Sequence, residues 1–368
     1  MALTWEDNTT LALRALFEQY GYRHYHMGKF EPYDLYLENR NFLQSDTVIT
    51  FPDAKGRLMA LKPDVTMSIV KSTAAEDTLR KLYYSENVFR MASGSSEYKE
   101  IHQIGVEYIG GADGYSEAET VLLAMKSLEI ISPDYLLTAG HMGFVTAMLR
   151  QFGLPETIHQ QAIDTLAHKN AHELTALCEQ AGVSPAGQTL MQQVLSISHP
   201  AKEALAILRE LSLEDEMASA LYELERLYKV LAGAGCGDRL RIDFSTVNDT
   251  DYYNGIVFQG FISGLPQYVL SGGRYDNLLR RFGKPQSAIG YAIYFGELNR
   301  YFREKRDLDA DILLLYGGTP AVRVMEAVQS LIAQGSSVLS ARSRPAGIRV
   351  GRVLTFDENG QLREVEPS

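Results

Sequence analysis

Glu100-Ile-His-Gln-Ile-Gly-Val-Glu-Tyr-Ile-Gly110 is the stretch of this chain that says most about its fold. Polar and apolar residues alternate in it, which predicts a β-strand whose side chains point to opposite faces in turn. Gln103, Gly105 and Glu107 then share one face. Glycine lets a ligand approach the backbone there, and the two polar side chains can meet an amide, ammonium or imidazole donor. The alternative is a solvated strand face, with His102 as a packing residue on the other side.

Strand-like segments lie on both sides of this stretch. Residues 82–90 form another apolar run, and residues 47–61 alternate around a turn, which predicts a hairpin. A helix is expected from Ala288 to Phe302. Four further strands are expected, at 136–139, 239–244, 253–262 and 268–271. The pattern predicts an α+β fold built on an antiparallel sheet flanked by helices.

Residues 144–233 interrupt the strands with a segment that is rich in Ala, Leu, Gln and Glu. Its pattern is almost wholly helical, so we expect a helical insertion. The insertion divides a discontinuous core domain into residues 1–143 and 234–305. A short C-terminal α/β domain is expected over 306–368, with a β-α-β unit followed by a closing hairpin.

The composition argues against several classes of protein. A formal net charge of −11 over 368 residues is unfavourable for binding a polyanion such as tRNA, because that affinity depends on many Lys and Arg side chains. Cys178 and Cys236 each stand alone, so neither a disulfide framework nor a metal site is expected, and no cofactor is indicated. The first residues lack a signal-peptide pattern and no stretch approaches a membrane span, so a cytoplasmic protein is expected.

Several segments resemble the signature stretches of class II aminoacyl-tRNA synthetases, and specifically of the histidyl-tRNA synthetase family. Leu61-Lys-Pro-Asp-Val-Thr66 is similar to the family's Leu-Arg-Pro-Glu-Gly-Thr element. Val88-Phe-Arg90 and the stretch 100–110 are similar to motif 2 and its return strand. Three more stretches are similar to the histidine-specific loop and motif 3: Thr250-Asp-Tyr-Tyr-Asn-Gly-Ile-Val-Phe258, Ser271-Gly-Gly-Arg-Tyr-Asp276 and Ala288-Ile-Gly-Tyr-Ala292.

The resemblance implies a class II synthetase-like fold with a pocket for an amino acid. Asp64 and Thr66 become candidates for an ammonium group, and Arg90 suits a carboxylate or phosphate through forked hydrogen bonds. The residues alone also permit a turn after Pro63, a structural ion pair at Arg90 and tyrosines that belong to the core. The implied histidine-binding set is Asp64, Thr66, Arg90, Gln103, Glu107, Tyr252, Tyr253 and Tyr275.

The nucleotide side of this implied site departs from the family. The family's Arg-Gly-Leu-Asp-Tyr-Tyr element is matched by Asn248-Asp-Thr-Asp-Tyr-Tyr253, so Asn248 stands where an arginine is expected. The Gly-Leu-Glu-Arg-Leu run of motif 3 is matched by Tyr294-Phe-Gly-Glu-Leu298, so Glu297 replaces a second arginine. A carboxylate there would repel the phosphates of ATP. Residues 91–99 also lack the arginines of motif 2, so no catalytic residue is expected.

A synthetase paralogue that keeps a histidine pocket and loses ATP and tRNA chemistry resembles the regulatory subunits of short-form ATP phosphoribosyltransferase. The resemblance implies a non-catalytic protein that assembles with a separate catalytic subunit, supports the first step of histidine biosynthesis and confers feedback inhibition by free histidine. It also implies at least a dimer, formed around Lys29-Phe-Glu-Pro-Tyr-Asp34. Two alternatives stay open, an active histidyl-tRNA synthetase and a non-catalytic tRNA-sensing module on the same fold.

Overall fold

The computed structural model describes residues 4–39, 43, 48–74, 79–91, 97–111, 113–211, 213–247, 252–296, 298 and 308–365. The chain divides into two compact units, residues 9–297 and residues 1–8 with 298–368. Each unit contains a sheet and a hydrophobic core of its own.

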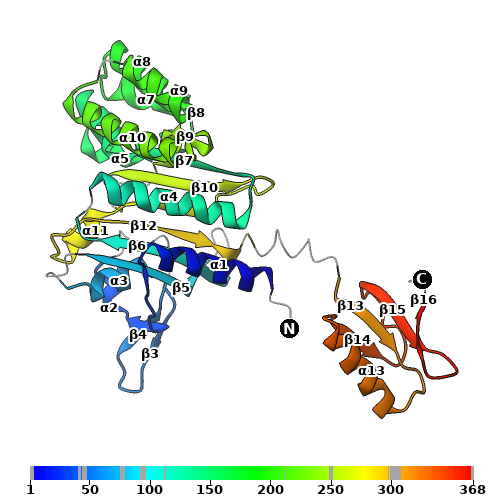
Figure 1. The fold of residues 1–368 in the computed structure, drawn as a ribbon. Helices are drawn as coiled ribbons and strands as arrows, with labels where there is room; N and C mark the ends of the chain where they lie inside the picture. Colours follow the sequence, from blue (N-terminus) through cyan, green and yellow to red (C-terminus); the bar gives the residue numbers. More distant parts are fainter. Residues whose placement is uncertain are drawn as a thin grey trace. The chain divides into compact units, whose positions relative to one another are not determined.

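A nine-stranded sheet runs through the large unit (Figure 1). Neighbouring strands are antiparallel, except that β1 runs parallel to β5 and β7 runs parallel to β9. This arrangement confirms the predicted α+β fold and its antiparallel sheet. In spatial order the strands are β1 (Arg23–His24), β5 (Arg80–Met91), β6 (Tyr98–Ile109), β12 (Ala288–Tyr294), β11 (Leu270–Arg274), β10 (Ile256–Ile262), β7 (Tyr135–His141), β9 (Leu240–Asp243) and β8 (Ser198–Pro200).

Two long helices, α1 (Trp5–Gln19) and α4 (Gly114–Ile131), cover one face of this sheet (Figure 1). The side chain of Asp113 accepts hydrogen bonds from the backbone N–H groups of the first turn of α4, so it supplies the N-cap. Tyr291 of β12 meets both helices. Its ring centroid lies 6.4 Å from that of Phe17, and its hydroxyl lies 2.9 Å from Ser127 Oγ.

Shorter elements pack against the opposite face. A three-stranded antiparallel sheet has the order β2-β4-β3, and the predicted hairpin corresponds to β3 and β4. Apolar residues from several of the short elements and from the large sheet form one buried cluster, which includes Val65, Ile69, Tyr84 and Leu278. The elements are β2 (Phe30–Pro32), β3 (Thr50–Pro52), β4 (Leu58–Leu61), α2 (Asp34–Leu37), α3 (Thr66–Ser72) and α11 (Asp276–Arg281).

The segment after β7 is mainly helical, as its pattern predicts, but it also contains β8, which extends the core sheet beside β9. The boundaries 1–143, 144–233, 234–305 and 306–368 stay predictions. No helix in the described part of the chain is both long enough and apolar enough to cross a bilayer. The elements are α5 (Met142–Gln151), η2 (Glu156–Ile158), α6 (His159–Ala167), α7 (Ala171–Gln180), α8 (Pro185–Ser196), α9 (Ala201–Arg209), α10 (Asp215–Gly233), η3 (Gly237–Arg239) and η4 (Phe244–Thr246).

The prediction of a helix from Ala288 to Phe302 is wrong over its first seven residues, which form the central strand β12. Short apolar runs fit a buried strand as well as a helix. The deciding constraint is the sheet, because Ala288–Tyr294 pairs along its whole length with β6 and over five residues with β11. Small residues on one face of β12, such as Gly290, also suit close approach of neighbouring groups.

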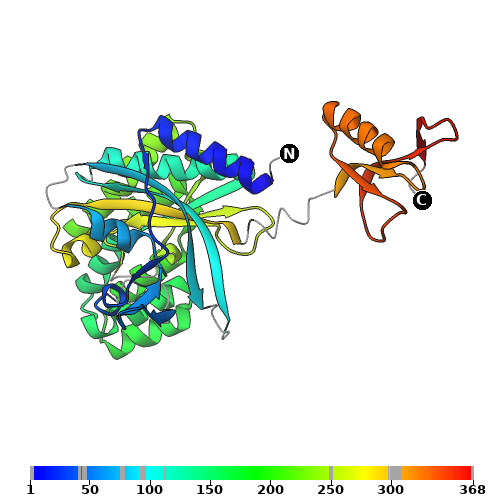
Figure 2. The ribbon, with the colours of Figure 1, turned by 90° about the horizontal axis from the view of Figure 1, so that it is seen from below.

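The smaller unit contains a four-stranded sheet of order β14-β13-β15-β16, with α13 on one of its faces (Figures 1 and 2). The parallel pair β13–β14 joined through α13 confirms the predicted β-α-β unit, and β15 and β16 form the predicted closing hairpin. Ile312, Leu314, Leu331 and Leu354 form the core. The elements are β13 (Ala310–Leu315), α13 (Ala321–Ala333), β14 (Val338–Ala341), β15 (Val350–Phe356) and β16 (Leu362–Val365).

A buried ion pair fixes the approach to the Pro63–Asp64 turn. Lys62 Nζ binds Glu86 Oε2, and the two side chains are only 1% and 9% exposed. The carbonyl oxygen of Lys62 also accepts a hydrogen bond of 3.0 Å from the backbone N–H of Phe89. The chain therefore leaves β4 in a fixed direction, beside β5, before it enters α3.

Lys62→Met should destabilise the large unit by about 3–5 kcal/mol, because it leaves the Glu86 carboxylate buried without its cation. The double variant Lys62→Met/Glu86→Leu should recover most of that loss. Urea unfolding measures both changes. Arg57→Met, which breaks the exposed Arg57–Asp53 pair, is the matched control and should have a much smaller effect. Equal losses in the single and double variants would contradict this role for the pair.

Candidate functional site

The floor of the site is formed by β6, the strand predicted from residues 100–110. Gln103 and Glu107 lie on the same face of this strand and are 3% and 2% exposed. The predicted shared face is therefore confirmed, and the alternative of a solvated face is wrong. Gly290 of β12 is the register partner of Glu107. A Cβ atom at Gly290 would lie 1.9 Å from Glu107 Oε2, so only glycine leaves room for this carboxyl group.

The carboxyl group of Glu107 is held by two hydroxyl groups. Thr66 Oγ1 donates to Oε1 at 2.6 Å, and the Tyr275 hydroxyl donates to Oε2. Burial raises the pKa of Glu107 to about 8, against the lowering effect of the two hydroxyl donors, and the nearby charge of Asp64 raises it further. Burial therefore favours the protonated form of Glu107 at neutral pH.

Asp64 and Arg90 place opposite charges at another part of the pocket wall. Arg90 Nε donates to the carbonyl oxygen of Pro63 at 2.7 Å, and Arg90 Nη2 lies 3.8 Å from Asp64 Oδ2. Asp64 Oδ1 accepts from the backbone N–H of Met67 at 2.8 Å, in the first turn of α3. Burial raises the pKa of Asp64, and the Arg90 guanidinium opposes that shift. The site thus contains a fixed cation and a carboxylate side by side.

Three tyrosines form an aromatic wall. The ring centroid of Tyr252 lies 4.7 Å from that of Tyr253 and 5.9 Å from that of Tyr275. Burial raises the pKa of Tyr252 and of Tyr275 well above the ordinary tyrosine value, so both hydroxyls stay protonated. A flat or cyclic side chain of a ligand would fit against such a wall.

All eight residues of the predicted histidine-binding set line one pocket. The other residues that line it are Tyr84, Ser271, Gly272, Gly290, Tyr291, Ala292 and Tyr294. Asn248, Glu297 and most of the altered motif 2 loop (residues 92–96) lie outside the described residues. Across the described ranges, no group of three His, Cys, Asp or Glu side chains is arranged to hold a metal ion.

Tyr294 is a pocket residue that was not among the sequence-based candidates. Its hydroxyl lies 2.7 Å from Ser271 Oγ, and its ring centroid lies 6.0 Å from that of Tyr268. It occupies the position of the first glycine in the Gly-Leu-Glu-Arg-Leu run of motif 3. A large aromatic side chain therefore stands where the family has no side chain. That exchange stands in the sequence beside the change to Glu297, and it adds an aromatic side chain to the residues that line the pocket.

Comparison with known proteins gives the same family throughout. The family model described as histidyl-tRNA synthetase matches residues 5–298. A relative from Desulforamulus reducens, named ATP phosphoribosyltransferase regulatory subunit, is 26% identical over 371 residues, which cover 95% of this chain and 91% of the relative.

Two solved structures share the fold. An ATP phosphoribosyltransferase regulatory subunit/histidyl-tRNA synthetase from Bacillus halodurans has a TM-score of 0.75 and 24% identity, covering 90% of this chain and 87% of that one. A chain of the ATP phosphoribosyl transferase complex from Thermotoga maritima has a TM-score of 0.64 and 17% identity, covering 80% of this chain and 100% of that one. By its family-model match over most of its length, this chain belongs to the histidyl-tRNA synthetase family.

Proposed function

We propose that this chain is the regulatory subunit of an ATP phosphoribosyltransferase and that its pocket binds free histidine. The observation that carries the proposal is the composition of the pocket wall. The eight residues predicted to bind the amino acid all line this pocket. By the family resemblance, Asn248 and Glu297 stand in the sequence where the family carries arginines for ATP. The names of the similar proteins from Desulforamulus reducens and Bacillus halodurans point to the same role.

Each part of histidine has a complementary group in this arrangement. Arg90 is the cation for the carboxylate, and Asp64 with Thr66 lies where an ammonium group can be received. Glu107 and Gln103 can pair with the imidazole nitrogens, which act as donor or acceptor according to tautomer. The tyrosines supply the apolar wall for the ring. A ligand without a ring nitrogen would offer neither Glu107 nor Gln103 such a partner, which is a basis for selectivity.

The catalytic partner is proposed to be the separate catalytic subunit of the short-form enzyme. The chain itself is proposed to carry out no chemistry, and histidine is proposed to favour one of its conformations. Such an effect is limited by the difference in histidine affinity between the two states. Self-association as a dimer is supported by exposed apolar side chains on the β2-β4-β3 sheet and α2: Phe30, Leu37 and Leu58 are 55%, 46% and 47% exposed.

Calorimetric titration should detect histidine binding to the purified chain. Arg90→Ala should weaken it at least tenfold, because a buried carboxylate would lose its cation. Arg280→Ala removes an exposed arginine that donates to Asn277 Oδ1 and does not line the pocket, so affinity should stay within twofold of the original. Absence of heat with the original chain, alone or in complex, would show that the pocket does not take histidine.

Glu107→Gln should change how stability depends on pH. The folded chain keeps the Glu107 proton up to about pH 8, whereas an ordinary glutamate releases it near 4.5. The raised pKa therefore contributes stability that is fully present below 4.5 and is lost as pH rises toward 8. Relative to the original chain, Glu107→Gln should gain about 2–4 kcal/mol of unfolding free energy between pH 5 and pH 8.

Urea unfolding at pH 5, 6.5 and 8 measures this gain. Glu100→Gln is the matched control on the same strand, since that carboxylate is exposed and binds Asn87. The difference in unfolding free energy between the Glu100→Gln variant and the original chain should not change with pH. A flat profile for Glu107→Gln as well would mean that Glu107 is ionised throughout.

Reconstitution with a catalytic phosphoribosyltransferase subunit tests the function as a whole. The chain should copurify with that subunit and raise its activity, and histidine should inhibit the complex, with Arg90→Ala raising the inhibitory concentration at least tenfold. Histidine-dependent ATP–pyrophosphate exchange should be absent, since the resemblance implies that Asn248 and Glu297 stand in place of two arginines that serve ATP. Robust exchange would establish an active synthetase, and salt-sensitive tRNA binding would favour the sensing module.

A further inference from the structure

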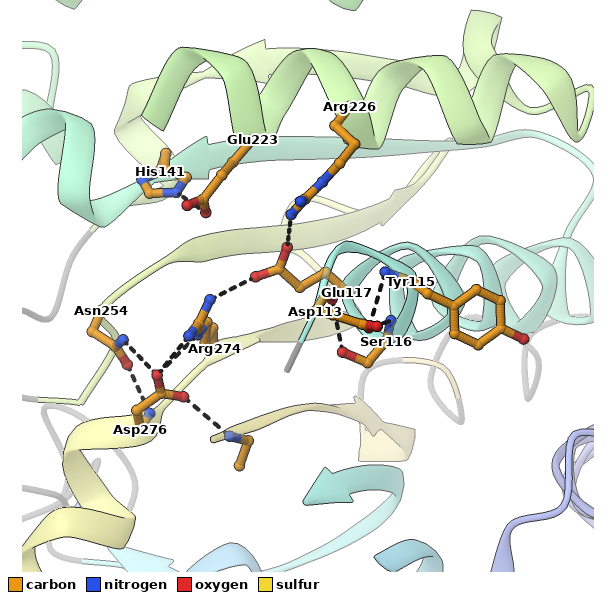
Figure 3. Close-up of polar contacts among 11 residues, drawn as sticks. Asp113, Tyr115, Ser116, Glu117, His141, Glu223, Arg226, Asn254, Arg274 and Asp276 are labelled. Carbon is orange, nitrogen blue, oxygen red and sulfur yellow. Dashed lines mark hydrogen bonds and ion pairs between the residues drawn. The ribbon is translucent and has the colours of Figure 1, made fainter. Parts of the chain in front are cut away.

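The corner between β11 and α11 carries Tyr275, which lines the pocket. Arg274 and Asp276 form an ion pair at this corner (Figure 3). Asp276, which is 4% exposed, accepts hydrogen bonds from Arg274 Nε at 2.9 Å and from Asn254 Nδ2 at 3.2 Å. Its other oxygen accepts from the backbone N–H of Ala288 at 3.0 Å. The backbone N–H of Tyr275 donates to the carbonyl oxygen of Ala288 at 2.9 Å. Tyr275 therefore moves only if this corner moves with it.

Arg274 connects the corner to α4. Its Nη1 donates to Glu117 Oε1 at 3.0 Å, while Arg226 Nη2 of α10 donates to Glu117 Oε2 at 3.1 Å (Figure 3). The Glu117 side chain is only 2% exposed. One buried carboxylate is thus shared by two arginines, one beside the pocket and one on the helical segment. Loss of either cation leaves that carboxylate dependent on the other.

Two glycines leave the space that the side chains of these arginines occupy. A Cβ atom at Gly114 would lie 2.1 Å from Arg226 Cζ, and a Cβ atom at Gly255 would lie 2.9 Å from Arg274 Cδ. Both arginine side chains therefore lie close to the backbone of these glycines, although the Arg226 side chain is 39% exposed.

Helix α10 is tied to the core at a second point one turn away. Glu223 Oε2 lies 3.0 Å from His141 Nε2, and His141 Nδ1 accepts from the backbone N–H of Phe144 at the start of α5. The hydrogen bond with His141 lowers the pKa of Glu223. Glu223 and Arg226 face the same side of the helix, so the position of α10 depends on these two polar contacts as well as on packing.

We propose that Arg274 is a positioning residue that couples occupancy of the pocket to the docking of α10. A ligand that binds Glu107 fixes Tyr275, whose hydroxyl donates to the same carboxyl group. The fixed corner keeps Arg274 on Glu117, and Glu117 in turn keeps Arg226 and α10 in place. The coupling rests on the proposed function, because it takes histidine as the ligand that fills the pocket.

Hydrogen–deuterium exchange of the full chain with and without saturating histidine tests this coupling. Amides of the segment that carries Asp64 and Thr66 should exchange at least fivefold more slowly with histidine, and amides of α10 should slow by a similar factor. Amides of α8 should not change, because α8 takes no part in this network.

Arg226→Ala should abolish the effect on α10 while the Asp64–Thr66 segment still slows. Arg226→Lys keeps the positive charge but removes the forked N–H donors of the guanidinium group. It provides a milder change if the alanine variant does not fold. Arg209→Ala is the matched control, since Arg209 pairs with Glu225 of α10 away from the network. It should leave the α10 effect intact.

The outcomes separate the two proposals. If the Asp64–Thr66 segment slows and α10 does not, the coupling is overturned and histidine binding stands. A protection of α10 that persists in both Arg226 variants, or an equal slowing of α8, also overturns the coupling. If no segment slows, histidine is not the ligand, and the proposed function fails together with the inference.

Discussion

The arrangement of the site depends on the hydrogen bonds of the Glu107 carboxyl group. An acid buried at the centre of a sheet has to find donors within the protein, because water is excluded and an unpaired polar group there is costly. Thr66 and Tyr275 supply those donors from two segments more than 200 residues apart along the chain, and Gly290 supplies the space. Satisfying this one group therefore brings α3, β6, β12 and the corner at Tyr275 together.

Much of this arrangement could be predicted from the sequence, since alternation along residues 100–110 defines a face irrespective of what covers it. Gln103 and Glu107 were assigned to one face in that way. The meeting of Asp64, Thr66, Arg90 and the tyrosines followed from family motifs whose order carries long-range information. The degree of burial could not be predicted, because it depends on elements that local pattern does not place, such as α3 over β6.

Other features could not be predicted from local sequence patterns, because they depend on contacts between distant parts of the chain. The stretch from Ala288 has apolar residues at spacings that suit a helix, and only its two partner strands make it β12. Glu117 is more than 100 residues from Arg226 and from Arg274 along the chain. No local sequence pattern therefore indicates that either arginine pairs with this carboxylate. Tyr294 could have been identified from the sequence, because it replaces a glycine within a single motif.

A site that senses an amino acid needs less chemistry than one that activates it, and it has different structural requirements. Activation demands fixed cations around a phosphate, whereas sensing demands that an occupied pocket and an empty one differ in a distant contact. The described residues fit the second requirement. Tyr275, whose hydroxyl faces the pocket, follows Arg274 directly in the sequence. The Arg274 guanidinium shares the buried carboxylate of Glu117 with Arg226 of α10. Because close packing resists gradual deformation, the proposed coupling implies two discrete positions of the helix instead of a continuum.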